Sequence, residues 1–219
     1  MSDSGSQPRS VLIVDDHPIV RQGLSQLINA EDDLMVCGDA ATVDEAMQSL
    51  DSADPDVVII DLSLADSDGL ELIKEIRNKT RQLPVLVLSM HDENMYAERL
   101  LSAGANGYIM KQAAADQLLT ALRRVLAGGV YVSEDLGASM VERLAGSEGK
   151  QDSNPFERLS NRELQVMNLI GRGQTTREVA ENLNLSVKTV ESHRQRIKKK
   201  LNLQTSAQLV HFAVSRYSQ

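Results

Sequence analysis

Five short apolar runs in the first half of the chain constrain its fold more than any other feature of the sequence. The runs are SVLIV at 10–14, LMVCG at 34–38, DVVII at 56–60, PVLVLS at 84–89 and GYIM at 107–110. They are rich in Val, Ile and Leu and do not alternate strictly with polar residues, which is typical of parallel strands buried on both faces. Segments with helical spacing separate them. The pattern predicts a doubly wound α/β domain with a five-stranded parallel sheet.

The chain changes character after this domain. A glycine pair and then a polar stretch rich in Gly, Ser and Asn indicate a linker over 128–154, with a possible short helix at 134–145. Only helical patterns follow. Capping boxes begin three helices, at SNRE (160–163), TTRE (175–178) and TSAQ (205–208), and Ser186 caps another. Residues 155–219 are therefore expected to form an all-α domain of four short helices.

Composition and charge bound the kind of protein. Of the 219 residues, 42% are hydrophobic, 25% are charged, and Cys37 is the only cysteine. This excludes an intrachain disulfide and fits a reducing compartment. No apolar run has the roughly 18 residues of a membrane span, and the N-terminus lacks a signal-peptide core. A cytoplasmic protein is expected. Residues 1–154 carry a net charge of −14 and residues 155–219 one of +6, which suggests an acidic module joined to one that binds a polyanion.

Charged and hydroxyl side chains stand at the carboxyl ends of the predicted strands. Asp15 and Asp16 follow the first strand, Asp61 the third, Ser89 closes the fourth, and Lys111 follows the fifth. The carboxyl ends of parallel strands meet at one edge, where ligands bind. Three carboxylates in one pocket need a cation, and oxygen ligands suit Mg²⁺. A lysine beside them fits a further anion, and a phosphoryl group on one aspartate would supply it.

Four stretches, VLIVDDHPIVRQGL, DVVIIDLSLADSDGLELI, VLVLSMHDE and GANGYIMK, resemble the receiver domain of two-component response regulators, over residues 9–127. The resemblance implies a flavodoxin-like fold with Asp61 as the phosphoacceptor. It also implies a role for six more residues: Asp16 as a direct Mg²⁺ ligand, Asp15 as an assisting ligand, Ser63 as a ligand through its backbone carbonyl, Ser89 as the switch hydroxyl, Lys111 as the phosphate-binding lysine, and Tyr108 as the aromatic residue that swings inward.

The chain departs from the receiver pattern at two places. Ala65 and Gln112 stand where such domains usually carry proline. Neither change removes a ligand, so we expect altered loop rigidity and an intact site. Ser63 and His91 occupy positions at which receivers tune dephosphorylation, although His91 is equally consistent with a solvated loop residue.

The helix predicted over SVKTVESHRQRIKKKL (186–201) points to nucleic acid. Val190, Ile197 and Leu201 share one face, while basic and polar residues cover the other. The region from Leu159 to Val210 is similar to the LuxR-type helix-turn-helix, whose second helix enters the DNA major groove. By that resemblance Glu191, Ser192 and Gln195 reach base edges, and the phosphate contacts are Lys188, Arg194, Arg196 and Lys199.

The last predicted helix carries an apolar stripe with two possible roles. Leu209, Val210, Ala213 and Val214 resemble the family's dimer-forming helix, or they pack in the core of the domain.

Together the two resemblances cover residues 9–215 and are those of the NarL/FixJ response regulators. They imply a non-enzymatic transcription regulator, switched by Mg²⁺-dependent phosphorylation of Asp61 by a sensor histidine kinase. Double-stranded DNA and, after phosphorylation, a second copy of the chain would be its partners, with no membrane involved. One alternative is an aspartyl-phosphate phosphatase or phosphotransferase, but these want a second acid where this chain has Ser63. Another is a receiver-like domain that is never phosphorylated, which the intact acidic set disfavours.

Overall fold

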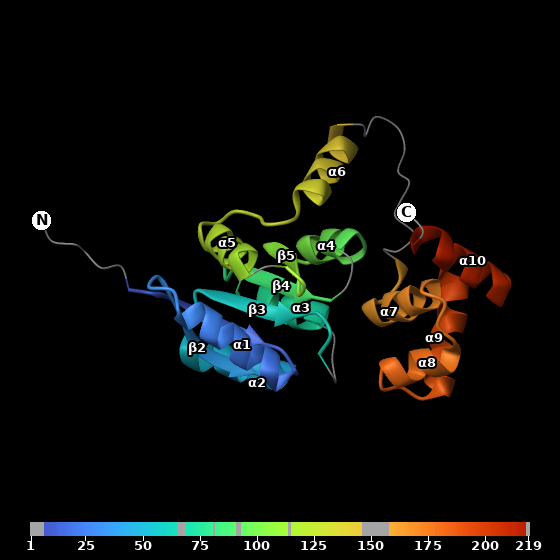
Figure 1. Ribbon diagram of the computed structural model, residues 1–219, viewed down its shortest axis with the longest axis horizontal. Coiled ribbons are helices and arrows are strands. Elements are labelled where there is room, and N and C mark those ends of the chain that lie inside the picture. The colour runs from blue at the N-terminus through green and yellow to red at the C-terminus, as the bar shows by residue number, and fades with distance from the viewer. Residues whose placement is uncertain are drawn as a thin grey trace, which may run out of the picture. The chain divides into compact units, whose positions relative to one another are not determined.

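The computed structural model describes residues 7–64, 69–80, 82–90, 93–113, 115–145 and 158–217. The chain divides into two compact units, Met1–Glu148 and Gly149–Gln219 (Figure 1). The division falls inside the segment 128–154 that the sequence predicts to be a linker. The polar stretch 146–155, Ala65 and His91 lie outside the described residues. Within the described part of the chain, no helix is both long and apolar enough to cross a membrane.

The first unit contains the five-stranded parallel sheet that the apolar runs predict. Its strands are β1 (Arg9–Val14), β2 (Leu34–Ala40), β3 (Val57–Asp61), β4 (Val85–Ser89) and β5 (Gly107–Met110). They pair in the order β2-β1-β3-β4-β5. Every residue of β3 and of β4 is buried, because helices cover both faces of the sheet.

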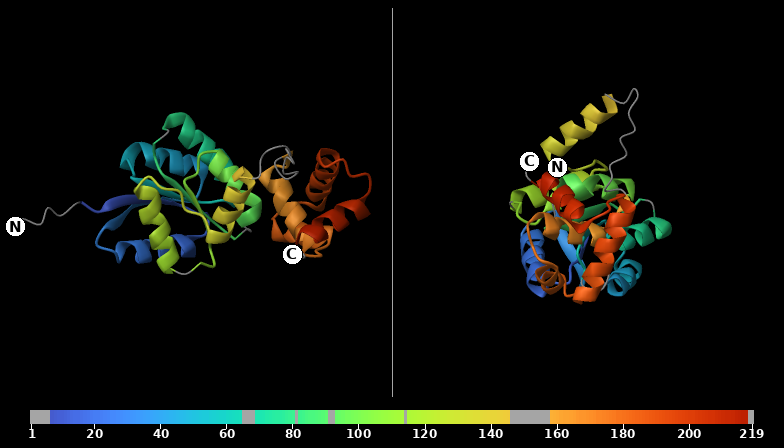
Figure 2. Two further views of the ribbon diagram at one scale, coloured as in Figure 1. Left: turned by 90° about the horizontal axis from the view of Figure 1, so that it is seen from above. Right: turned by 90° about the vertical axis from the view of Figure 1, so that its right-hand side faces the viewer.

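Five helices connect and cover these strands: α1 (Pro18–Asn29), α2 (Val43–Ala53), α3 (Gly69–Lys79), α4 (Glu93–Ser102) and α5 (Ala115–Leu126). Ile28 of α1 and Leu118, Leu122 and Val125 of α5 share one core with alternate strand residues. Right-handed crossovers place α2 and α3 on the opposite face, as the left view of Figure 2 shows. The doubly wound α/β prediction is confirmed.

A short segment after α5 extends the sheet beyond β5. Gly128, with φ of 81°, turns the chain, and Tyr131 forms a parallel bridge with Gly107. Helix α6 (Glu134–Ala145) follows, over the residues where a short helix is expected. The first residues of the predicted linker therefore pack as part of the α/β unit.

The described part of the second unit, residues 158–217, contains the four helices expected from the sequence: α7 (Asn161–Gly171), α8 (Thr176–Asn182), α9 (Val187–Lys200) and α10 (Ser206–Tyr217). The capping boxes at Ser160 and Thr175 are confirmed, with reciprocal bonds to Glu163 and Glu178. Asn184, with φ of 51°, makes the tight turn between α8 and α9. Val190 and Ile197 are fully buried, so the opposite face of α9 is presented to solvent.

Candidate functional site

Strands β1 and β3 bring the three predicted aspartates together. These two strands are paired neighbours in the sheet. Asp15 and Asp61 are 1% and 3% exposed, and Asp16 is partly exposed. One ligand atom each from Asp15, Asp16, His17 and Asp61 lies within 4.8 Å of the others. The site is therefore a compact acidic cluster with the donor atoms to hold a cation.

Lys111 joins two of these carboxylates. Its Nζ lies 2.7 Å from Asp15 Oδ2 and 2.8 Å from Asp61 Oδ2, and its backbone N–H donates to the carbonyl of Ser89 at 2.8 Å. Burial by itself would lower the pKa of the Lys111 ammonium. The charge of Asp61 and the hydrogen bonds to both carboxylates have the larger, opposite effect, so the pKa lies above its ordinary value. Lys111 is thus held as a cation between two buried acids.

The environment of Asp61 disfavours its charge. Burial raises the pKa of this carboxyl above its ordinary value, against the opposing attraction of Lys111, and the nearby Asp15 adds to the increase. The backbone N–H of Ser63 donates to Asp61 Oδ1 at 3.2 Å. A cation at the acidic cluster would relieve the repulsion between the carboxylates.

His17 belongs to the cluster, although the sequence analysis did not include it. Its Nδ1 lies 2.6 Å from Asp16 Oδ1 and 3.2 Å from Asp15 Oδ1, while 62% of the side chain is exposed. Its position directly after the two aspartates was the only available signal. Sequence alone does not show that the ring turns back toward the carboxylates.

Ser89 and Tyr108 lie on the two strands that follow Asp61 in the sheet. Ser89 ends β4 and is fully buried, and Tyr108 of β5 is 1% exposed. The family resemblance implies that the aromatic ring swings inward on activation. In this structure Tyr108 is buried and lines a cavity together with Glu93 and Tyr131. Gln112, next to Lys111, is exposed.

The recognition helix α9 presents most of its predicted DNA contacts. Six of the seven are exposed, namely Lys188, Glu191, Ser192, Gln195, Arg196 and Lys199. The seventh, Arg194, has a side chain only 13% exposed, and its Nε lies 3.8 Å from Glu191 Oε1. The Ser192 hydroxyl donates to the carbonyl of Lys188 in its own helix. His193, on the packing side, is half-buried, and this burial lowers its pKa.

Helix α10 divides its apolar stripe between two environments. Leu209 and Ala213 are fully buried in the domain, whereas Val210 and Val214 are 40% and 39% exposed. The first pair is therefore core, and the second pair lies at the surface of the domain, while the dimer role of this helix stays a prediction.

The fold and the two sites define a regulator in which an α/β signal-receiving domain is joined to a helix-turn-helix domain. The response regulator receiver domain family matches residues 11–123, and the luxR family of bacterial regulatory proteins matches residues 157–213. The chain belongs to the response regulators, of the NarL/FixJ type with a LuxR-type DNA-binding domain.

Relatives of this architecture match the chain over almost its full length. The oxygen regulatory protein NreC of Staphylococcus carnosus is 39% identical over 211 residues, covering 94% of this chain and 97% of NreC. The response regulator UvrY of Escherichia coli K12 is 36% identical over 205 residues, covering 94% and 93%.

Solved structures agree with this assignment. RcsB from Salmonella typhimurium is 27% identical, with a TM-score of 0.63 and coverage of 96% of this chain and 98% of RcsB. RcsB bound to the rprA promoter in the presence of the phosphomimetic BeF3⁻ is 28% identical, with a TM-score of 0.60 and coverage of 95% and 98%. A LuxR-family response regulator from Aurantimonas is 32% identical, with a TM-score of 0.59, covering 63% of this chain and 99% of that one.

Proposed function

We propose that Asp61 accepts a phosphoryl group from the phosphohistidine of a sensor kinase. The observation that carries this is Lys111, held by Asp15 and Asp61 at the sheet edge. A carboxylate oxygen of Asp61 attacks phosphorus, the P–N bond of the donor breaks, and the imidazole nitrogen takes up a proton. The ammonium of Lys111 is placed to pair with the oxygens of the new acyl phosphate.

The acidic cluster fits Mg²⁺, which we propose as the cofactor. Asp15, Asp16 and Asp61 supply the carboxylate oxygens that this ion prefers, and the carbonyl of Ser63 would add another. The ion would neutralise charge on the transferred group. The imidazole of His17 is a poor Mg²⁺ ligand, and we assign it no place in the coordination.

The switch would use groups on neighbouring strands. Ser89 would donate its hydroxyl to the phosphoryl group, and Tyr108 would report the change on β5. Such a local charge event biases a two-state element.

The output is sequence-specific binding to double-stranded DNA by α9, in the cytoplasm where that DNA lies. Lys188, Arg196 and Lys199 would contact phosphates and set affinity, while Glu191 and Gln195 would read bases. The RcsB complexes with DNA support this output. Phosphorylated copies would dimerise on paired half-sites, with Val210 and Val214 of α10 available for the contact.

The test is phosphorylation by a small acyl phosphate with Mg²⁺, read by intact mass and by size-exclusion elution, with Asp61→Asn alongside. A phosphate adduct on the wild-type chain that is lost in Asp61→Asn, together with an earlier-eluting dimer, is expected. Absence of an adduct at every Mg²⁺ concentration would contradict the proposal. Steady turnover of a small phosphate ester, measured in a separate assay, would instead favour the enzymatic alternative.

A further inference from the structure

The carboxylate of Glu191 on the recognition helix is held by a residue of the preceding helix. Thr176, the first residue of α8, donates its hydroxyl to Glu191 Oε1 at 3.1 Å. Arg194 Nε lies 3.8 Å from the same oxygen. Within the described residues, no hydrogen bond reaches the second oxygen, Oε2. One oxygen is thus anchored, and the other is free to accept from a ligand.

An anchored carboxylate has a specific use in the major groove. An ionised glutamate can only accept hydrogen bonds, and its usual base partner in the major groove is the N4 amino group of cytosine, because the adenine N6 donor lies beside the N7 acceptor. A free glutamate side chain loses rotamer freedom when it binds, which costs affinity. A hydroxyl that fixes Oε1 beforehand reduces that cost and aims Oε2.

We infer that Thr176 is a positioning residue that sets the preference of Glu191 for cytosine at one base pair. The inference rests on the proposed DNA-reading role of α9. Thr176 need not touch DNA for this purpose, because it acts through the Glu191 carboxylate. Arg194 supports the same geometry from within α9, since it lies one turn further along the helix.

The experiment uses the phosphorylated full-length chain. Binding sites are selected from random duplexes, and affinity is then measured for every single base-pair substitution of the best site. The variants are Thr176→Val, which keeps shape and loses the hydroxyl, and Thr176→Ser, which keeps the hydroxyl. Glu191→Ala is measured alone and combined with Thr176→Val.

Glu191→Ala should abolish discrimination for cytosine at one position. Thr176→Val should reduce discrimination at that same position by about two- to tenfold, the factor expected for ordering one long side chain. Thr176→Ser should retain it, and Thr176→Val should add nothing once Glu191 is alanine. A uniform loss of affinity across all sequences in Thr176→Val would overturn the inference. Failure of the wild-type chain to select any duplex would instead contradict the proposed function.

A second inference rests on different contacts, at the start of the linker. The Tyr131 backbone N–H donates to Asn106 O at 3.0 Å, and the Tyr108 N–H donates to Tyr131 O at 2.9 Å. A side-chain Cβ at Gly107 would meet the Tyr131 carbonyl oxygen at 3.0 Å, so glycine permits this close approach. The segment around Tyr131 lies against the edge of β5 as an added strand.

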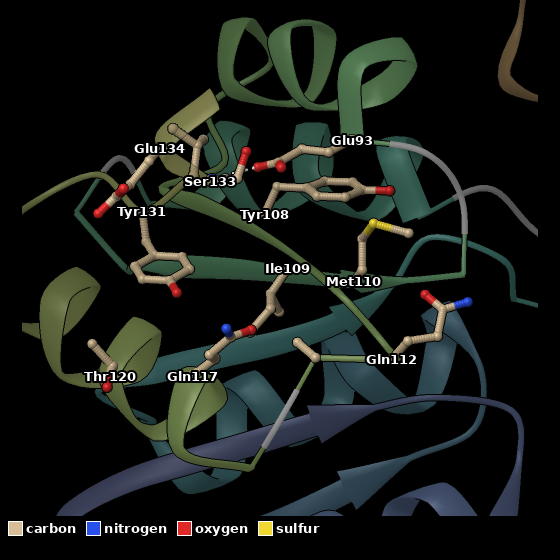
Figure 3. A pocket seen from close by; sticks show the side chains of 12 residues that line it. Glu93, Tyr108, Ile109, Met110, Gln112, Gln117, Thr120, Tyr131, Ser133 and Glu134 are labelled. Atoms are coloured by element: carbon tan, nitrogen blue, oxygen red, sulfur yellow. Dashed lines mark hydrogen bonds between the residues drawn. The ribbon is translucent and has the colours of Figure 1, made fainter. Parts of the chain in front are cut away.

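Glu93 ties this added strand to α4. Its Oε1 accepts from the Ser133 backbone N–H at 2.8 Å, and Figure 3 shows the Glu93 side chain reaching toward Ser133. Glu93 is buried. The Ser133 hydroxyl accepts in turn from the Leu136 N–H in the first turn of α6. Leu136 is 2% exposed. The three residues link the first turn of α4 to the first turn of α6.

We propose that Glu93 couples the β4–α4 region to the linker helix. Glu93 begins α4, four residues after Ser89, so a rearrangement at Ser89 moves the acceptor that holds Ser133. Loss of that bond frees the added strand and the cap of α6. The link to phosphorylation rests on the proposed function, but the hydrogen bond itself can be tested without it.

Hydrogen exchange over residues 130–137 tests this coupling. Glu93→Ala should raise the exchange rate there by about tenfold or more, the factor expected for loss of a hydrogen bond to a charged group. Glu93→Gln, which keeps an acceptor, and Glu134→Ala, the matched control, should stay near the wild-type rate. Phosphorylation should raise wild-type exchange and add nothing to Glu93→Ala. Unchanged exchange in Glu93→Ala would overturn the contact. If a verified phosphate adduct left the wild-type exchange rate unchanged, the coupling to phosphorylation would be wrong, although the Glu93–Ser133 hydrogen bond would stand.

Discussion

Replacing Lys111 by methionine would remove the ammonium that bridges Asp15 and Asp61. The two carboxylates would remain in their buried positions, at 2% and 3% side-chain exposure. Methionine has nearly the same length, so the substitution tests charge rather than shape. The lost contacts are charge-assisted hydrogen bonds of 2.7 and 2.8 Å.

The expected cost is about 3 kcal/mol of unfolding free energy without divalent ions. Breaking a buried ion pair costs about 3–5 kcal/mol because a charge is left uncompensated. Protonation of Asp61 limits that cost. Protonating a carboxyl group at pH 7 costs about 1.4 kcal/mol for each unit by which its pKa lies below 7. An ordinary carboxyl pKa lies about three units below, so protonation costs at most about 4 kcal/mol, and the loss of stability cannot exceed that value. The pKa of Asp61 is already raised by burial, so the limit falls below that value.

Urea denaturation at pH 7 measures the effect, in EDTA and again in millimolar Mg²⁺. Because the proposed Mg²⁺ site exists only in the folded state, Mg²⁺ should recover more than half of the loss, and it should stabilise Lys111→Met more than wild type. A loss below about 1 kcal/mol in EDTA, or a loss of equal size with and without Mg²⁺, would refute this account of the cluster.

Three further substitutions test the packing by urea denaturation. Gly104→Ala should destabilise by about 1–3 kcal/mol, because φ is 108° and the new Cβ would lie 2.7 Å from Arg77 Nε. Gly23→Ala, inside α1 with nothing within 4 Å of the new Cβ, should stabilise the protein by about 0.5–1 kcal/mol. If the two glycine substitutions changed the unfolding free energy in the same direction, this reasoning would be wrong. Lys200→Met should cost about 1–2 kcal/mol at pH 7, because Lys200 Nζ lies 2.6 Å from buried Glu163 Oε2. Burial raises the pKa of Glu163, but the bonds from Lys200 and Ser160 hold it below its ordinary 4.5. The stability that Glu163 contributes is therefore present above pH 4.5 and lost as pH falls, so the Lys200→Met difference should shrink below that pH; a constant difference would refute it.

The sequence alone determined the elements and the class of the protein. Buried parallel strands leave unbroken apolar runs, and capping boxes mark helix starts, because both depend on residues that are neighbours in sequence. The acidic site could also be predicted from the sequence, since the carboxyl ends of the strands in a parallel sheet gather at one edge. Asp15, Asp61 and Lys111 meet as expected, although Lys111 stands 96 and 50 residues away from the two aspartates.

Other features depended on how side chains pack once the elements are in place. Three features follow from side-chain rotamers and neighbours that no local pattern encodes. They are the contact of the His17 ring with Asp16, the burial of Tyr108, and the division of α10 between core and surface. The sequence assigns residues 128–131 to the linker. They stay against β5 because Gly107 admits a second backbone at that edge.

Local sequence patterns therefore predicted which segments are helices and strands, whereas the tertiary structure decided which side chains contact each other. Periodicity and capping report the local environment of a residue, buried or exposed, helical or extended. The bonds of Thr176 with Glu191 and of Glu93 with Ser133 join residues 15 and 40 positions apart. Such bonds form only when two elements approach at one distance and orientation, and packing of the whole domain sets both.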